Sequence, residues 1–437
     1  MLRGSGKIKK INKIMITNIS MIYYLRFQQR HYSKIKSRMA FPAVEGSSLP
    51  NEVCGKDERV QVVPMNSPPY KWIYSLLIES ARGVMYKGSG FKIHLPDVNR
   101  TAVVTSGHCT YVEGAYADKI TVTFPGKRAV EVGPNDIYAS PEYIDTGSPD
   151  HDYGLILLPG ASDDGFGWSA IMSDEKLNNR IVTNCGYPAD KPGGTMWITG
   201  GSISSYTVNR IYYMNDTMGG QSGSPVYTWR GGYWTVLAVH SYGGCPNSAP
   251  RFTAEMISRF LEQMNVLKKT SLRSVAFPDV YLRCDGTGVT HWVGPGGGTV
   301  NCQYKPPSSW ESFYIYPVEM APSSAPQTTI KVAIESAQFR HVFIRMDSEG
   351  MSHFIYTGGG KVNCQFATSS WESYFIRKET NGAVSFRNVQ FPHLYIRLDG
   401  TGVHSWSSSG SGTVNCQYYD DPSSAASSWE SFHLEEH

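Results

Sequence analysis

Three short segments carry side chains whose types and order could activate a serine hydroxyl. One is a Gly-Gln-Ser-Gly run that holds Ser222, a second is a Thr-Ser-Gly-His-Cys run that holds His108, and the third is an Asp-His-Asp-Tyr run that holds Asp152. A serine hydroxyl is a weak nucleophile at neutral pH, so it needs an adjacent base, and that base needs a carboxylate to orient it. The chain order His, Asp, Ser therefore predicts one nucleophilic site assembled from all three segments.

The three side chains are expected to divide the chemistry between them. Ser222 attacks, His108 takes the hydroxyl proton and passes it to the leaving group, and Asp152 holds the imidazole in the useful tautomer. Glycines beside the serine allow a tight turn, so the backbone N–H groups of Gly220 and Ser222 are predicted to face a developing oxyanion. Asp150 is the alternative carboxylate, but a strand-like Tyr-Gly-Leu-Ile run directly follows Asp152. Each motif alone is more often a plain turn or a surface residue; their order and context favour catalysis.

The bulk composition is that of a folded protein with two or three domains. The chain has 437 residues, of which 41% are hydrophobic and 18% are charged. Its net charge of +3 is too small to indicate a nucleic-acid partner. No run of about 18 uncharged apolar residues occurs, so no transmembrane segment is expected. Neither a metal-ligand cluster nor a phosphate-binding loop stands out, so no metal and no cofactor are predicted.

Residues 1–52 differ from the rest of the chain. Residues 1–44 contain ten Lys and Arg and no Asp or Glu, and a moderately apolar stretch at 14–25 is interrupted by polar residues. Such a segment is a poor secretory signal. Three interpretations are left open: a weak signal anchor, a transit-like leader, or an upstream extension with translation starting at Met39, which would favour an intracellular protein.

The C-terminal part, residues 271–437, is a threefold repeat. Each unit holds an Arg-x-Asp run, a Val-Asn-Cys-Gln run and a Ser-Trp-Glu-Ser run, and its short alternating segments predict about four strands. One such unit cannot bury its own apolar face, so the three must share a core. This arrangement predicts a β-trefoil, and the motifs resemble the fascin-like (actin-crosslinking-type) β-trefoils. The link at 269–274 is short, which predicts limited freedom between the domains.

Several residues recur in all three units. Packing, turn and strand-pairing roles are favoured over sugar-binding sites for three arginines, three aspartates and three tryptophans, which are Arg283, Arg345, Arg397, Asp285, Asp347, Asp399, Trp310, Trp371 and Trp429. Three equivalent cysteines cannot pair among themselves and are expected to be buried small hydrophobes; these are Cys302, Cys364 and Cys416. The trefoil is interpreted as a binding or targeting module whose ligand, carbohydrate or protein, is left open.

Residues 53–270 are expected to form a mostly β domain that ends in one helix. Apolar residues at near-helical spacing lie at 252–268, after strand-like runs at 72–79, 101–105, 153–158, 180–183 and 234–240. Many strands followed by one C-terminal helix suit an all-β, chymotrypsin-like double β-barrel. The eight cysteines of the chain do not form a recognisable disulfide framework.

The same half of the chain resembles the bacterial-type glutamyl endopeptidases, a branch of the trypsin-like serine proteases. The resemblance is carried by the Ser222 loop and by the segments at 53–59, 186–192, 195–197 and 236–243. It implies protein or peptide substrates, the triad His108, Asp152 and Ser222, and a pocket in which Thr217 and His240 hold a glutamate at P1. A buried carboxylate needs such partners. The resemblance also favours secretion and a mature N-terminus near 51–53.

Alternatives remain open for the same half. Asp216 lies six residues before Ser222, where trypsin keeps the acid that binds Lys or Arg, so a basic P1 preference is the specificity alternative. His240 could instead be a core histidine. The bridge that many trypsin-like enzymes make next to the catalytic histidine is expected to be missing, because Cys109 has no cysteine opposite it at 88–91. A non-catalytic binding protein is the alternative from another class, and the intact set of three residues disfavours it.

Overall fold

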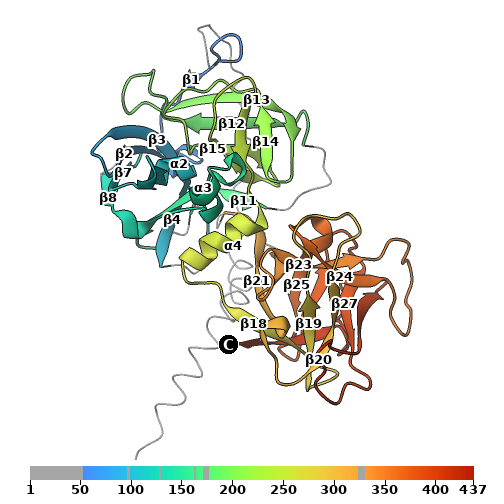
Figure 1. The fold of residues 1–437 in the computed structure, drawn as a ribbon. Coiled ribbons are helices and arrows are strands. Elements are labelled where there is room, and N and C mark those ends of the chain that lie inside the picture. The colour runs from blue at the N-terminus through green and yellow to red at the C-terminus, as the bar shows by residue number, and fades with distance from the viewer. Residues whose placement is uncertain (1–52, 96–98, 127–128, 162–163, 171–176, 323–329) are drawn as a thin grey trace, which may run out of the picture.

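The computed structural model describes residues 53–95, 99–126, 129–161, 164–170, 177–322 and 330–437. The predicted leader at 1–52 and most of the Pro/Ser-rich insert near 321–327 lie outside these residues. The described chain forms an N-terminal region, residues 53–268, and a C-terminal region, residues 269–437. Helix α4 (Ala254–Gln263) lies between the two regions (Figure 1).

The first sheet of the N-terminal region is antiparallel, and its strands follow the order β8-β7-β2-β3-β4-β10-β9. Alternating buried side chains from its central strands, such as Leu76 and Ile120, form a separate core. The strands are β2 (Ile73–Glu79), β3 (Met85–Lys92), β4 (Arg100–Thr105), β7 (Lys119–Thr123), β8 (Ala129–Val132), β9 (Ile137–Ala139) and β10 (Gly154–Pro159). Short helices α2 (Gly107–Thr110), α3 (Pro141–Thr146) and η4 (Pro149–His151) and the hairpin of β5 (Tyr111–Val112) and β6 (Ala115–Tyr116) lie between them.

A second set of strands completes the N-terminal region. They are β1 (Val60–Gln61), β11 (Gly167–Ser169), β12 (Ile181–Gly186), β13 (Trp197–Tyr206), β14 (Arg210–Tyr213), β15 (Pro225–Arg230), β16 (Tyr233–Val239) and β17 (Asn247–Pro250). Each strand-like run of the sequence lies within a few residues of an observed strand. The observed helix is shorter than the predicted one at 252–268, since α4 spans only Ala254–Gln263. The next strand begins at Lys269.

The C-terminal region contains four strands per repeat, as predicted. They are β18 (Lys269–Ser274), β19 (Val280–Asp285), β20 (Thr299–Tyr304) and β21 (Ser312–Met320) in the first unit, β22 (Ile330–Ser336), β23 (Val342–Asp347), β24 (Lys361–Phe366) and β25 (Ser373–Lys378) in the second, and β26 (Val384–Asn388), β27 (Leu394–Asp399), β28 (Thr413–Tyr418) and β29 (Ser431–Glu436) in the third. Strands β21, β25 and β29 each pair with the first strand of the next unit, and β29 returns to β18. The segment at 269–274 is therefore part of this ring and not a linker.

The recurring arginines and tryptophans pack together inside each unit. The Arg283 guanidinium lies 4.5 Å from the centre of the Trp310 ring, and the equivalent pairs in the other units lie at 4.5 and 4.3 Å. Each tryptophan also meets a phenylalanine of the following unit edge-on, in the pairs Trp310–Phe339, Trp371–Phe391 and Trp429–Phe277. This favours the predicted packing role over sugar stacking for these residues. The three equivalent cysteines are fully buried and unbridged, as expected.

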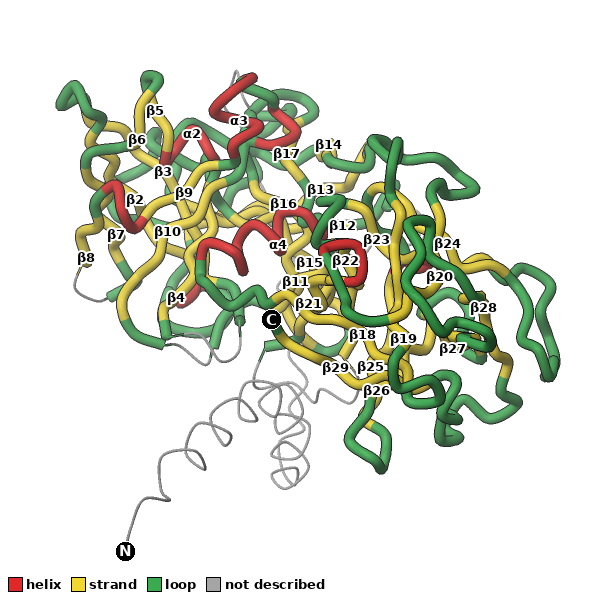
Figure 2. Tube along the Cα trace, turned by 60° about the horizontal axis from the view of Figure 1, so that its bottom comes forward, coloured by secondary structure: helices red, strands yellow, loops and turns green. Residues whose placement is uncertain are grey.

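The two regions share one hydrophobic core. Side chains of the N-terminal region, including Trp168 and Phe260, pack in the same cluster as Val318 and Phe343 of the C-terminal region. Strand β11 also pairs with β21 across the boundary. Figure 2 shows β11, β21 and α4 side by side from a second direction. Limited freedom between the two regions was predicted from a short link. The structure attributes it instead to a continuous sheet and a shared hydrophobic cluster.

A buried carboxylate ties α4 to the C-terminal region. Glu335 on β22 is fully buried and accepts hydrogen bonds from Ser258 Oγ at 2.9 Å, Tyr316 Oη at 2.7 Å and Arg340 Nε at 2.9 Å. Burial raises the pKa of Glu335, but Arg340 and these donors lower it by more, so the carboxyl stays charged.

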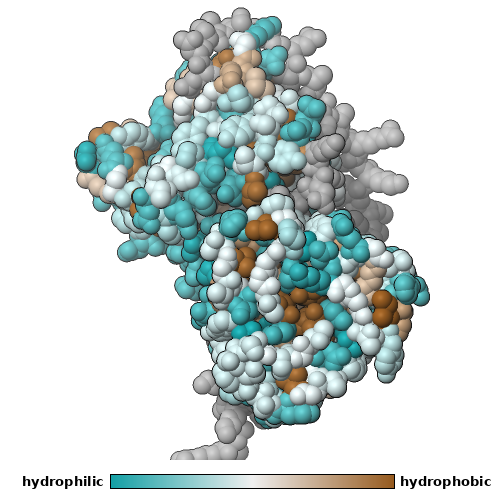
Figure 3. All heavy atoms as spheres, turned by 45° about the vertical axis from the view of Figure 1, so that its right-hand side comes forward, coloured by the Kyte–Doolittle hydropathy of each residue, from teal (hydrophilic) through white to brown (hydrophobic). Residues whose placement is uncertain are grey.

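The surface gives no sign of a membrane-spanning helix within the described residues, since none of their helices is long and apolar enough. The face seen in Figure 3 is mostly hydrophilic, with hydrophobic side chains in small, separate groups.

Replacing Glu335 by alanine should destabilise both regions together. The change removes the acceptor that the Ser258 and Tyr316 hydroxyls share, and it leaves Arg340 ion-paired with Glu262 alone, so we expect the free energy of unfolding to fall by about 3 kcal/mol. Chemical denaturation followed by tryptophan fluorescence measures this. Glu435→Ala is the matched control, because the Glu435 carboxylate is one third exposed, so the loss of its bonds to Arg273 and the Tyr281 hydroxyl should cost about 1 kcal/mol. Equal losses in the two variants would contradict the assignment.

Candidate active site

His108 and Asp152 are joined by two hydrogen bonds. The backbone N–H of His108 donates to Asp152 Oδ1 at 2.8 Å, and its ring Nδ1 lies 2.8 Å from Asp152 Oδ2. Helix α2 begins after Ser106, and this start turns the histidine backbone toward the carboxylate at the entry to β10. Asp152 is fully buried, whereas 31% of the His108 side chain is exposed and therefore open to a substrate.

The Ser222 loop packs against β3 and the Cys109 side chain of α2. The backbone N–H of Ser89 on β3 donates to the Ser222 carbonyl at 2.7 Å, and Cys109 Sγ lies 3.8 Å from that oxygen. Cys109 directly follows His108, so the backbone of the Ser222 loop lies next to the segment that carries the candidate base. Among the described residues, no hydrogen bond joins the Ser222 hydroxyl to the His108 ring. The order of the motifs predicted that these two segments meet, and the structure adds that β3 contacts both of them.

Close packing holds the loop beside the histidine. Gly223 has a positive φ of 84°, and a Cβ there would lie 2.1 Å from both Ser89 O and Thr105 Oγ1, so only glycine fits. The Gly223 N–H donates to His240 O at 2.7 Å, and Ser106 Oγ donates to the same carbonyl at 2.9 Å. One backbone oxygen thus connects the serine loop to the start of α2.

Two N–H groups of the loop have no acceptor among the residues that the structure describes. Within the described residues, the backbone N–H groups of Gly220 and Ser222 donate no hydrogen bond, while Gly220 O accepts from Ser89 Oγ at 2.9 Å. The side chain of Gln221 is buried and accepts from Met218 N at 3.0 Å, which holds the turn from behind. The pair of free donors is what an oxyanion would require.

The electrostatic surroundings favour a charged His108. Burial lowers the pKa of His108, but the neighbouring Cys109 and the Asp152 carboxylate raise it by more, so the pKa lies well above its ordinary value of 6.5. Ser241 Oγ donates to the backbone carbonyl of Asp152 at 3.1 Å and so helps to hold the main chain of that residue in place. Ser241 was not singled out from the sequence, because no local motif marks it.

Asp150, the alternative carboxylate, is engaged elsewhere. Its Oδ1 accepts from Arg210 Nε at 3.0 Å, and 43% of its side chain is exposed. Of the two aspartates, only Asp152 contacts His108.

His240 is a neutral, buried histidine behind the Ser222 loop. Its Nδ1 lies 2.5 Å from the Tyr213 hydroxyl, and burial, assisted by the charge of His108, lowers the pKa of His240 to about 3. A neutral ring whose Nδ1 accepts from Tyr213 must carry its proton on Nε2. Nε2 has no hydrogen-bond partner among the described residues, so His240 offers one donor. Tyr213 lies 27 residues away along the chain, so no sequence signal could have linked the two.

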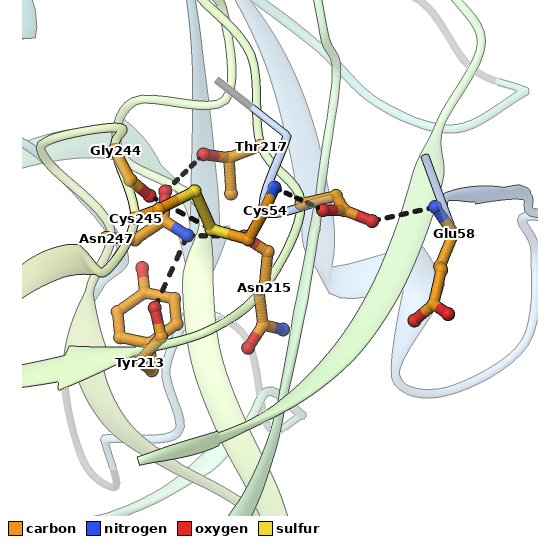
Figure 4. The surroundings of a disulfide bond; sticks show 9 residues. Cys54, Glu58, Tyr213, Asn215, Thr217, Gly244, Cys245 and Asn247 are labelled. Atoms are coloured by element: carbon orange, nitrogen blue, oxygen red, sulfur yellow. Dashed lines mark hydrogen bonds between the residues drawn. A yellow bond between two sulfur atoms is a disulfide. The ribbon is translucent and has the colours of Figure 1, made fainter. Parts of the chain in front are cut away.

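Thr217, the second predicted pocket residue, is fully buried and donates from Oγ1 to Asn247 Oδ1 at 2.5 Å. Figure 4 shows this pair close to the bridge between Cys54 and Cys245. The Asn247 amide in turn donates to the carbonyls of Tyr213 and Asn215, which fixes its orientation.

Asp216 is occupied by the N-terminal segment. Its two carboxylate oxygens accept from the backbone N–H groups of Cys54 at 2.8 Å and Glu58 at 2.7 Å (Figure 4). Asp216 is also buried. This structural role removes the reason for assigning it to a basic P1 side chain, so the sequence-based alternative loses its support.

The Cys54–Cys245 disulfide was not anticipated from the sequence. It closes a loop of 191 residues, so nothing local in the sequence indicates it. A salt-bridge cluster reinforces the same segment: Arg59 donates to Asp57 at 2.8 Å and to Asp190 at 2.7 Å. The salt bridge to Asp190 joins segment 53–59 to segment 186–192. Both segments carried part of the family resemblance.

Cys109 is unbridged, as predicted, and the structure identifies what stands opposite it. A Cβ placed on Gly88 would lie 3.0 Å from Cys109 Sγ. Glycine therefore occupies the position from which a second cysteine could reach the first.

One group of side chains could hold a metal ion, although none was predicted. Ligand atoms of Glu142, His151 and Glu255 lie within 4.8 Å of one another, beside a cavity of about 390 Å³ between the two regions. Glu142 is already bound by Arg259 at 2.8 Å and by Ser140 Oγ at 2.8 Å. The group lies outside the contacts of His108 and Ser222.

Several known proteins are similar to part of this chain. The chain is 31% identical over 253 residues to a glutamyl endopeptidase of Bacillus licheniformis, which covers 53% of this chain and 75% of that protein. It is 30% identical over 205 residues to a protein named extracellular metalloprotease of Bacillus subtilis and 27% identical over 239 residues to a glutamyl endopeptidase of Staphylococcus aureus. The chain spans only 64% and 66% of the lengths of those two relatives. No family model matches the chain.

Among solved structures, a Glu endopeptidase in complex with MPD matches with a TM-score of 0.38 and 24% identity, over 49% of this chain and 97% of that one. The similarities to curated proteins define the chain as a serine endopeptidase. It belongs to the glutamyl endopeptidase family.

Replacing Gly88 by cysteine should create a disulfide with Cys109. The Cβ position suits a bridge, and closing the loop should raise the free energy of unfolding by about 3 kcal/mol in oxidising buffer. Mass spectrometry of the linked peptide and thermal unfolding measure the two effects. Gly88→Ala is the control, since it adds the Cβ without the thiol, and reduction should abolish the gain. Two free thiols after oxidation would contradict the geometry.

Proposed function

We propose that the protein hydrolyses peptide bonds through a covalent acyl-enzyme on Ser222, with a preference for glutamate at P1. The observation that carries this proposal is the pair of hydrogen bonds between His108 and the buried Asp152, beside a serine loop with two unused N–H donors. Membership of the glutamyl endopeptidase family supports it.

Each side chain has a definite part in the proposed reaction. His108 Nε2 takes the hydroxyl proton as Ser222 Oγ attacks the scissile carbonyl, and the N–H groups of Gly220 and Ser222 stabilise the oxyanion. The imidazolium then gives its proton to the leaving amine, and the acyl-enzyme remains. Water attacks this ester with His108 as base, which releases the acid and restores Ser222. Asp152 stays charged and stabilises the imidazolium throughout.

The proposed P1 pocket recognises a carboxylate through neutral donors. His240 presents N–H at Nε2 because Tyr213 donates to Nδ1 and the low pKa keeps the ring uncharged. Thr217 adds its hydroxyl, which turns from Asn247 to the substrate carboxylate on binding. Two donors at a buried site match a carboxylate, whereas the Asp216 carboxylate that a Lys or Arg side chain would need is already bonded to two backbone N–H groups.

We further propose that the C-terminal region is a β-trefoil that serves as a binding or targeting module. The support is the ring of twelve strands in three equivalent units, closed by β29 on β18, together with the Arg–Trp–Phe contacts that pass from each unit to the next. A domain line drawn at residues 270 and 271 would cut β18, so the boundary belongs at Lys269.

A P1 scan tests the proposed activity. Cleavage of a peptide library by residues 53–437 should fall mainly after Glu and drop by about 10⁶-fold in Ser222→Ala. His240→Ala should lower kcat/KM for Glu substrates by about 10²-fold while leaving slow cleavage at other residues intact. Mass spectrometry maps the cleaved bonds. Cleavage after Lys or Arg would refute the proposed pocket, and undiminished cleavage by Ser222→Ala would refute the nucleophile.

The pH dependence tests the histidine. His108 must be neutral to act as a base and its pKa is raised, so kcat/KM should fall as the pH drops through a midpoint above 6.5. Removing the Asp152 charge lowers that pKa, so Asp152→Asn should move the acid limb to lower pH and reduce kcat by about 10⁴-fold. Asp150→Asn is the control and should leave the limb in place. An acid limb that stays unmoved in Asp152→Asn would exclude this pairing.

A further inference from the structure

Three large aromatic side chains are exposed at the same position in the three repeats. Trp292, Phe354 and Trp406 are each the seventh residue after the aspartate that ends the second strand of the unit. Their exposed fractions are 49%, 57% and 60%. The residue after the ring differs in all three units, being Val, Ile and Ser, and the residue before it is His in two units and Ser in the third. An aromatic ring is therefore kept where its neighbours have changed, although no core packing requires it.

The loops that carry these rings are bound in a cycle by the next unit. Backbone pairs join each loop to the third strand of the unit that follows, and the third loop returns to the first unit, in the pairs Gly297–Cys364, Gly359–Cys416 and Ser411–Cys302. Each loop is thus anchored a few residues beyond its aromatic ring.

A glutamine fixes the residue directly after the ring in two of the loops. The backbone N–H of Val293 donates to Gln365 Oε1 at 3.1 Å, and the Gln365 amide donates back to Val293 O. Gln303 makes the same two bonds with Ser407, whose N–H lies 3.0 Å from Gln303 Oε1. Trp292 and Trp406, which precede Val293 and Ser407, are therefore presented on preorganised loops. A ligand need not order these loops on binding.

The chemistry of the loops is almost free of charge. Residues 286–298, 348–360 and 400–412 contain a single charged side chain, Glu349, together with serine, threonine and histidine side chains. Without Lys or Arg, the loops offer nothing for a phosphate or a nucleic acid. An exposed ring beside hydroxyl and imidazole groups matches the apolar face and the hydroxyls of a sugar ring.

We propose that Trp292, Phe354 and Trp406 form three equivalent stacking sites for a neutral polysaccharide. This inference rests on the proposed binding role of the C-terminal region and is independent of the proteolytic activity. Each site holds one sugar face weakly, and a polymer that spans more than one site gains avidity. Trp292 also borders the cavity between the two regions, so the first site presents its sugar beside the N-terminal region.

Co-sedimentation with insoluble cellulose, chitin and β-1,3-glucan tests the proposal. The full described chain, residues 53–437 with Ser222→Ala to prevent self-cleavage, should be retained by at least one of them. Each of Trp292→Ala, Phe354→Ala and Trp406→Ala should weaken retention by about 3- to 10-fold, and the triple variant should lose it. These side chains are exposed, so thermal unfolding of the variants should stay unchanged.

Trp229→Ala is the matched control, because Trp229 lies in the N-terminal region with the same exposed fraction as Trp292, 49%. It should bind as the parent does. Absence of retention on all three polysaccharides, or equal retention of the triple variant, would overturn the inference. Retention on neutral phosphatidylcholine vesicles that is lost in the triple variant would assign the rings to a lipid surface and also overturn it. Peptide cleavage by variants that keep Ser222 reports separately on the proposed protease.

Discussion

The buried carboxylate of Asp152 is the constraint on which the proposed catalytic half depends. A buried charge must be compensated by hydrogen-bond donors. Here the donors are the backbone N–H and the ring Nδ1–H of His108. The start of α2 is therefore fixed relative to β10, and Ser106 at that start reaches the His240 carbonyl, which also holds Gly223. Through these few bonds, the position of one carboxylate determines where the serine loop can lie.

The N-terminal segment, residues 53–59, is bound to the loops around the proposed pocket. The disulfide to Cys245, the Asp216 carboxylate and the Arg59 cluster all fasten residues 53–59 to loops beside Thr217 and His240. Asp216 is therefore a structural acid in this chain, although its place in the sequence suggests a specificity residue. The proposed pocket would then rely on the neutral donors of Thr217 and His240, which is a chemical reason for proposing an acidic side chain there.

The C-terminal region is built from contacts that run in one direction around three units. Strand pairs, Trp–Phe contacts and loop bridges each pass from one unit to the next and close on the first. Only the second unit carries Glu335, which binds Ser258 on α4, so the symmetry is broken where the N-terminal region attaches. A shared core and a continuous sheet then couple any ligand held by the repeats rigidly to the endopeptidase half.

Local patterns in the sequence predicted the repeats, the strand segments, the unbridged Cys109 and the order of the three candidate residues. They could do so because alternation, repetition and short motifs depend only on neighbours along the chain. The strand-like run after Asp152 already favoured it over Asp150, and the tertiary structure added the spatial partners, His108 for Asp152 and Arg210 for Asp150. The tertiary structure also decided the Cys54–Cys245 bridge, the role of Asp216, the Tyr213–His240 bond and the hydrophobic cluster that joins the two regions. Each of these joins residues that are far apart in the chain, and no local pattern encodes such a meeting.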